Sequence, residues 1–156
     1  MVEQGGRALL EQSGLPDSMW HHAVRAFCHS KNAAVSGGTS AWSRRFGSHF
    51  LGSPIPFGAQ VVVGAGTGGS GDSAVFLGHS VRPGSCECPG ALVAKLPGPG
   101  TGGGNVSVTT NLEIYKVKEV TLDAKDGIQF PFREGRRCGG GDVPTPAGHD
   151  GVVSAS

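Results

Sequence analysis

The chain has 156 residues, of which 28 are glycine and 10 are proline, and hydrophobic residues make up only 37%. This composition argues against a large enzyme with a single extensive core. The formal net charge of +1 neither requires nor excludes a nucleic-acid partner, so any basic surface must be local. No apolar run approaches the roughly 18 residues that span a membrane, and no signal-peptide core is visible. We expect an intracellular protein of the nucleus or cytoplasm, with reduced cysteines and no membrane partner.

The first predicted helix covers residues 2–13. Gly14 suits the left-handed position after a helix, and Leu15 and Pro16 follow as the usual hydrophobic contact and stop signal. Gly5 and Gly6 lower the helix propensity of its first turns, so we expect this helix to fray.

The second predicted helix, residues 17–32, has the clearest amphipathic pattern. Trp20, Val24, Phe27 and Cys28 recur on one face and predict a single apolar stripe. The sequence does not decide whether other parts of the chain cover this stripe or leave it exposed.

A third, short helix is predicted within residues 39–50. Thr39 or Ser40 can cap its start, and Gly47 can end it.

From residue 54 onward the pattern changes to that of short strands rich in β-branched residues. The apolar segments are followed by a Gly/Pro-rich stretch from residue 134 onward, which predicts a disordered tail. The order of elements indicates an α+β fold whose β part is a small barrel or curled sheet. The strand candidates are residues 55–63, 73–81, 91–96, 106–123 with a break near Tyr115–Lys116, and 127–132.

A glycine-rich segment follows the strand candidate 55–63. Gly64, Gly66 and Gly69 match the spacing G-x-G-x-x-G of dinucleotide-binding loops. That motif must open a helix, whereas the residues that follow here are typical of a strand. The pattern therefore favours a loop between strands, and a nucleotide-binding enzyme is kept as a rival hypothesis that requires a helix near Gly69.

No metal site or catalytic site is predicted. Cys86 and Cys88 form one pair of potential ligands, but Cys138 and the histidines supply no second pair. His22 and His29 share a helix face without the glutamate of an H-E-x-x-H motif. Nucleophile-elbow, P-loop and paired-carboxylate motifs are absent from the sequence.

A local cluster of aromatic and basic residues lies in the third helix. Trp42 beside Arg44 and Arg45 is a combination that can stack on bases and neutralise phosphates. The alternative interpretation is that Trp42 anchors the short helix while the two arginines are solvated.

Five segments in sequence order resemble one known protein family. They are "RALLEQSGLPDSMWHHAVRAFCHSKNAA", "TSAWSRRFG", "IPFGAQVVV", "AVFLGHSV" and "YKVKEVTLD". Their order resembles the integrase region of copia-type LTR retrotransposon Pol polyproteins, over roughly residues 7–132. The resemblance implies that residues 1–52 are the C-terminal helical edge of an incomplete RNase H-like integrase core. It implies an SH3-like β domain for residues 53–133 and a tail for residues 134–156.

The resemblance also implies what this chain lacks and what it retains. The parent integrase uses Mg²⁺ or Mn²⁺ on acids that would precede Met1, and a structural Zn²⁺ in a further segment. This chain is therefore expected to be a catalytically incomplete segment that is not an enzyme and needs no cofactor of its own. Its expected partners are DNA or another nucleic acid and the rest of the Pol polyprotein. The alternative is a decayed structural or protein-interaction remnant. The expected nucleic-acid-binding residues are Trp42, Arg44, Arg45, Lys116, Lys118 and Arg133.

Overall fold

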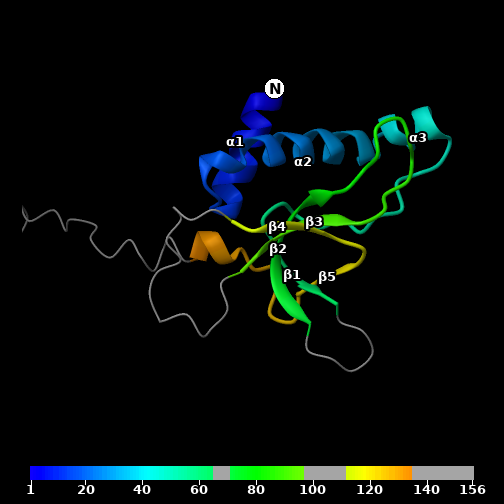
Figure 1. Cartoon of the computed structure of the whole chain (residues 1–156). Coiled ribbons are helices and arrows are strands. Elements are labelled where there is room, and N and C mark those ends of the chain that lie inside the picture. The colour runs from blue at the N-terminus through cyan, green and yellow to red at the C-terminus, as the bar shows by residue number, and fades with distance from the viewer. Residues whose placement is uncertain (65–70, 97–111, 135–156) are drawn as a thin grey trace, which may run out of the picture.

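A computed structural model describes residues 1–64, 71–96 and 112–134 of the chain. Helices form the first third and an antiparallel sheet follows, so the predicted α+β order is confirmed (Figure 1). The helical elements are α1 (Val2–Ser13), the 3₁₀ turn η1 (Asp17–Met19), α2 (Trp20–Ala33) and α3 (Ala41–Phe46). The strands are β1 (Gln60–Val63), β2 (Asp72–His79), β3 (Ala91–Lys95), β4 (Ile114–Val117) and β5 (Val120–Leu122).

The ends of the helices lie where the local sequence predicts them. Gly14 follows α1 with φ of 72°, and its N–H donates to the carbonyl of Leu10. Gly47 follows α3 with φ of 76°, and its N–H donates to the carbonyl of Ser43. Both glycines adopt the left-handed conformation, which residues with a side chain disfavour.

α1 and α2 approach each other closely because two glycines face α2. A β-carbon at Gly6 would lie 3.0 Å from the Trp20 ring and 3.1 Å from the Val24 side chain. A β-carbon at Gly5 would overlap the ring of Phe27. These glycines weaken the helix locally, but they allow the α2 stripe to pack on the α1 backbone. The stripe is nevertheless only half-buried, and in α2 itself the fully buried residue is Ala23.

The sheet has the strand order β4-β3-β2-β1-β5, with every described pair antiparallel. Its two edge strands, β4 and β5, are consecutive in sequence and are joined only by Lys118 and Glu119. Because this link is so short, the sheet must curl to bring its two edges near each other. The edges are not hydrogen-bonded to each other among the described residues, so the sheet is not closed into a barrel, and of the two expected forms the structure has the curled sheet.

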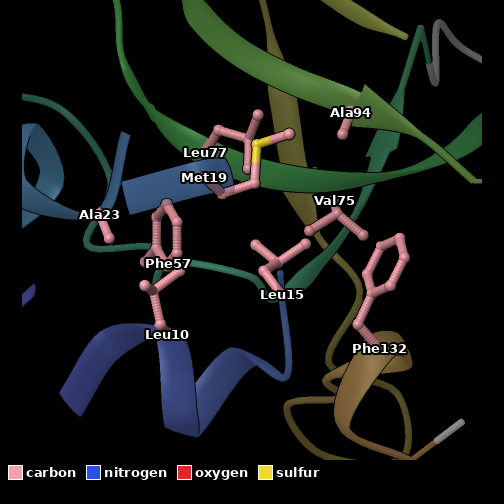
Figure 2. Close-up of a cluster of buried hydrophobic side chains, with 9 residues drawn as sticks. All are labelled: Leu10, Leu15, Met19, Ala23, Phe57, Val75, Leu77, Ala94 and Phe132. Atoms are coloured by element: carbon pink, nitrogen blue, oxygen red, sulfur yellow. The ribbon is translucent and has the colours of Figure 1, made fainter. Parts of the chain in front are cut away.

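The two faces of the sheet carry separate apolar clusters. One face packs under the helices, where Leu10, Leu15, Met19 and Ala23 meet Val75 and Leu77 of β2 (Figure 2). The opposite, inner face is formed around five buried residues, which are Val61, Ala74, Phe76, Ala91 and Val93. Since helices and strands share the first cluster, the core crosses the predicted boundary at residue 52.

Two details of the expected strands are corrected. The break in the last long strand lies at Lys118–Glu119 rather than near Tyr115–Lys116. Residues 127–132 form no strand in the sheet, and the chain there enters a helical turn over residues 131–134 that places Phe132 in the core. The strand expected after the glycine-rich segment is confirmed, because β2 begins at Asp72, where the rival nucleotide-binding hypothesis requires a helix. Gly66, Gly69 and the expected tail beyond residue 134 lie outside the described residues.

Candidate functional site

The predicted nucleic-acid-binding residues of α3 are held by a reciprocal cap at the start of that helix. The Ser40 hydroxyl accepts a hydrogen bond from the Ser43 N–H at 3.0 Å, and the Ser43 hydroxyl accepts one from the Ser40 N–H at 3.0 Å. This capping box satisfies two backbone donors that would otherwise be unpaired. A helix of only two turns is marginal alone, so the cap and the packing of Trp42 must hold it in place.

Trp42 is buried, with a relative exposure of 7%. Its ring contacts Phe46 and Phe50 at centroid distances of 4.7 Å and 5.1 Å, and the imidazole of His29 on α2 at 5.7 Å. Base stacking needs an exposed ring face, so the burial of Trp42 disfavours its expected role in stacking. The geometry agrees with the alternative interpretation, in which Trp42 anchors α3 to α2.

Arg44 and Arg45 are exposed to solvent. Neither forms an ion pair with a carboxylate among the residues that the structure describes. The Arg45 guanidinium lies 5.4 Å from the centroid of the Phe46 ring, a cation–π contact that orients it without neutralising it. The two charges are therefore free to meet phosphates.

The structure brings only part of the remaining predicted set near α3. Trp42 and Lys118 line one hollow of about 480 Å³, which places the β4–β5 turn beside α3. Lys116 is exposed on the edge strand β4. The backbone of Arg133 instead lies against Gly14 after α1. The orange helical turn 131–134 is on the left in Figure 1, whereas α3 is on the right. The six residues therefore do not form one continuous surface.

A cluster of aromatic and imidazole rings joins α3 to α2 and to the end of β2. The ring of Phe50 lies 4.6 Å from that of His29 and 4.9 Å from that of His79, and the two imidazoles are 5.2 Å apart. The sequence predicts a solvated or partly packed His29 rather than a metal ligand, and it does not predict the pairing of His29 with His79. No spacing rule would find it, because the two residues lie on different elements and meet only in the folded chain.

Burial favours the neutral form of both histidines in this cluster. Burial, and then the nearby His79, lower the pKa of His29. Burial also lowers the pKa of His79, against a smaller opposing effect of the bond to Ser53. That bond, 3.1 Å long, ends on a carbonyl oxygen, which can only accept, so Nε2 of His79 carries the proton and donates it.

Within residues 1–64, 71–96 and 112–134, no group of three or more His, Cys, Asp or Glu side chains could hold a metal ion. Cys28, Cys86 and Cys88 are free thiols, and the Cys88 sulfur lies 3.5 Å from the carbonyl oxygen of Gly90.

None of the helices in the described part of the chain is long and apolar enough to cross a membrane. Comparison with protein-family models, curated proteins and solved structures gave no match to this chain.

Proposed function

We propose that this chain is a non-catalytic segment of a copia-type retrotransposon polyprotein, in which the end formed by α3 and the β4–β5 turn contacts DNA. The observation that carries the proposal is the pair Arg44 and Arg45. Both are exposed, neither has a carboxylate partner among the described residues, and both sit on a helix that a capping box and a buried tryptophan fix in place.

The chemistry of this surface favours contact with phosphates rather than with base edges. Guanidinium groups bind phosphate oxygens well, and scattered basic residues carry no pattern that reads base edges. Lys118, across the hollow from Trp42, adds a third cation at this end. We therefore expect weak binding that depends on salt and is independent of sequence.

The expected SH3-like identity of the β part belongs to the same proposal. It is supported by the strand order β4-β3-β2-β1-β5 and by the two-residue link between the edge strands. A bulge between Phe76 and Gly78 in the long strand β2 also supports it, because such a bend lets one strand serve both halves of a curled sheet.

The proposal is tested by fluorescence-anisotropy titration of duplex DNA at two salt concentrations. Arg44→Ala/Arg45→Ala should weaken binding and reduce the slope of log K against log salt by about 1 for each arginine. The matched control is Arg7→Ala/Lys125→Ala, which removes the same charge at two exposed residues outside the expected nucleic-acid-binding set. Trp42 is left intact because removing a buried anchor would confound binding with folding.

Each outcome of this comparison either supports or contradicts the proposed DNA-binding surface. Loss of binding in the α3 variant with retention in the control supports the proposal. Equal loss in both variants means that net charge alone governs binding, which contradicts a localised surface. Absence of binding by the folded wild-type chain contradicts the proposal entirely.

A second candidate function is a protein-interaction module. A hollow of about 810 Å³ between α1 and α2 has Leu10, Leu15, Trp20 and Val24 among its lining residues. Glu3, Arg7, Glu11 and Asp17 also line it, so acids outnumber bases there. DNA is repelled by such a lining, and a protein segment with apolar and basic side chains is complementary to it. Binding of a partner protein that survives Arg44→Ala/Arg45→Ala would favour this candidate.

A further inference from the structure

We infer that the hollow between α2 and residues 50–57 is a binding site for an uncharged aromatic molecule. Its volume is about 430 Å³, within the usual range for small-molecule sites and enough for about two or three fused or linked rings. The site is built mainly from α2, the segment before β1 and the end of β2. None of the described residues that line it belongs to α3, the helix that carries Arg44 and Arg45.

The lining of this cavity is apolar and aromatic. Its apolar walls include Leu9, Ala26, Ala33, Ile55, Phe57 and Phe76. No Asp, Glu, Lys or Arg is among the lining residues that the structure describes. Aromatic ligands gain from such walls both by leaving water and by meeting Phe and His rings edge to face.

The polar groups of the cavity are themselves neutral. His29 and His79 both line it, and burial lowers the pKa of each ring. Nε2 of His29 is shielded from solvent and has no hydrogen-bond partner among the described residues. A charged ligand would therefore lose its hydration here without gaining an ionic partner, and that loss disfavours it strongly.

The cavity is open to solvent and is not a sealed packing defect. Ser30, Ala34, Ser53 and Pro54 line it and are exposed, so they form its rim. On the inner side, Gly78 has φ of 137° and carries no side chain to fill the space. A β-carbon built there would lie 3.9 Å from the Ala26 methyl group. A ligand can therefore enter between the end of α2 and the Ser53–Pro54 segment.

A pair of fluorescent probes tests both the cavity and its neutrality. N-phenyl-1-naphthylamine is uncharged, and 1-anilinonaphthalene-8-sulfonate is the same skeleton with an anionic group. Both become bright in apolar surroundings, so each can be titrated against the full chain. We expect saturable binding of the neutral probe at one site and binding of the sulfonate that is weaker by at least about tenfold.

Two variants locate the bound probe. Ala33→Phe should fill the cavity, and Ala34→Trp should block its exposed rim with little effect on the core. The matched control is Ala8→Phe, an exposed alanine of α1 that does not line the cavity. Circular dichroism and thermal unfolding establish that each variant is folded.

The inference is supported if both cavity variants lose binding of the neutral probe and the control variant keeps it. It is overturned if the folded wild-type chain shows no saturable binding, a result that would leave the hollow to an apolar side chain of a protein partner. It is equally overturned if the sulfonate binds as tightly as the neutral probe, or if Ala34→Trp binds like the wild type.

Discussion

The imidazole of His29 on α2 lies 5.2 Å, centroid to centroid, from the imidazole of His79 at the end of β2. The two rings join the helical layer to the sheet, and Phe50 contacts both of them. Each ring resists protonation in the folded chain, because burial lowers its pKa below the ordinary value of 6.5. The folded state is therefore coupled to pH through this contact.

The free energy of unfolding should fall as the pH drops below 6.5. In the window between the lowered pKa and 6.5, the unfolded chain binds more protons than the folded chain, so acidification favours unfolding. Above this window the histidines are neutral in both states and do not reduce the free energy of unfolding. Below it, the reduction that their protonation causes is complete. Urea unfolding at about pH 7.5 and about pH 5.5 measures the change, and both values lie above the range where carboxylates titrate.

The histidines responsible can be separated by substitution. His29→Gln/His79→Gln should flatten the pH dependence over this window. His22→Gln is the comparison, since burial, and then His21 and Arg25, lower the pKa of His22 as well. An unchanged pH dependence in the double variant would show that the His29–His79 contact does not control it.

Gly5→Ala should destabilise the protein by about 1 kcal/mol, although alanine is the better helix former. The propensity gain is about 1 kcal/mol, whereas overpacking costs about 1–3 kcal/mol, and a β-carbon at Gly5 overlaps the Phe27 ring. In a Phe27→Ala background the clash is absent, so the same substitution should stabilise. Thermal unfolding of the wild type, the two single variants and the double variant gives the coupling free energy between residues 5 and 27. Additive effects would refute close packing of α1 on α2.

Ser40→Ala should cost about 1 kcal/mol through loss of the cap on α3. The Ser40 side chain is part of a reciprocal pair with Ser43, and Ser40 itself is 3% exposed. Urea unfolding measures the cost, and tryptophan fluorescence reports whether Trp42 becomes solvated. Ser48→Ala is the control, because Ser48 is exposed and outside the capping box; an equal effect of both variants would argue against the cap.

Trp42→Ala should destabilise the protein by about 3 kcal/mol or more, as expected for truncating a buried aromatic side chain. Arg44→Ala, on the same helix, should change stability by no more than about 0.5 kcal/mol, because its side chain is exposed. Chemical unfolding of both variants measures the difference. A small effect of Trp42→Ala would mean that the ring is not an anchor and would restore its expected role in stacking.

Gly58→Ala and Gly64→Ala separate backbone strain from packing. Both glycines have positive φ, 80° and 72°, so each substitution should cost about 1 kcal/mol in strain. At Gly58 the new methyl group would also overlap the Ser13 side chain, whereas at Gly64 no atom of the described residues lies within 4 Å. Gly58→Ala should therefore be clearly the more damaging substitution in thermal unfolding. Similar losses at the two positions would contradict the close approach of the β1 entry to α1.

The local features of this fold were predictable because they depend on neighbours in the sequence. Gly14 and Gly47 end helices through their own backbone freedom, and Ser40 caps α3 through a residue three positions away. The first three strands follow from β-branched and apolar runs bounded by glycine and proline. The order of helices before strands, and hence the α+β class, follows from these local patterns.

Features that depend on distant contacts could not be predicted in the same way. Trp42 is aromatic beside arginine, which suits a nucleic-acid surface, but α2 and Phe50 cover it. Residues 127–132 are apolar enough for a strand, yet a helical turn places Phe132 under α1 and the sheet. The sequence alone determined where α1 and α3 end and where the first three strands lie. Only the tertiary structure decided which side chains are buried and that His29 meets His79. The physical reason is that capping and turn conformation are set within a few residues, whereas burial depends on which distant surfaces exclude water together.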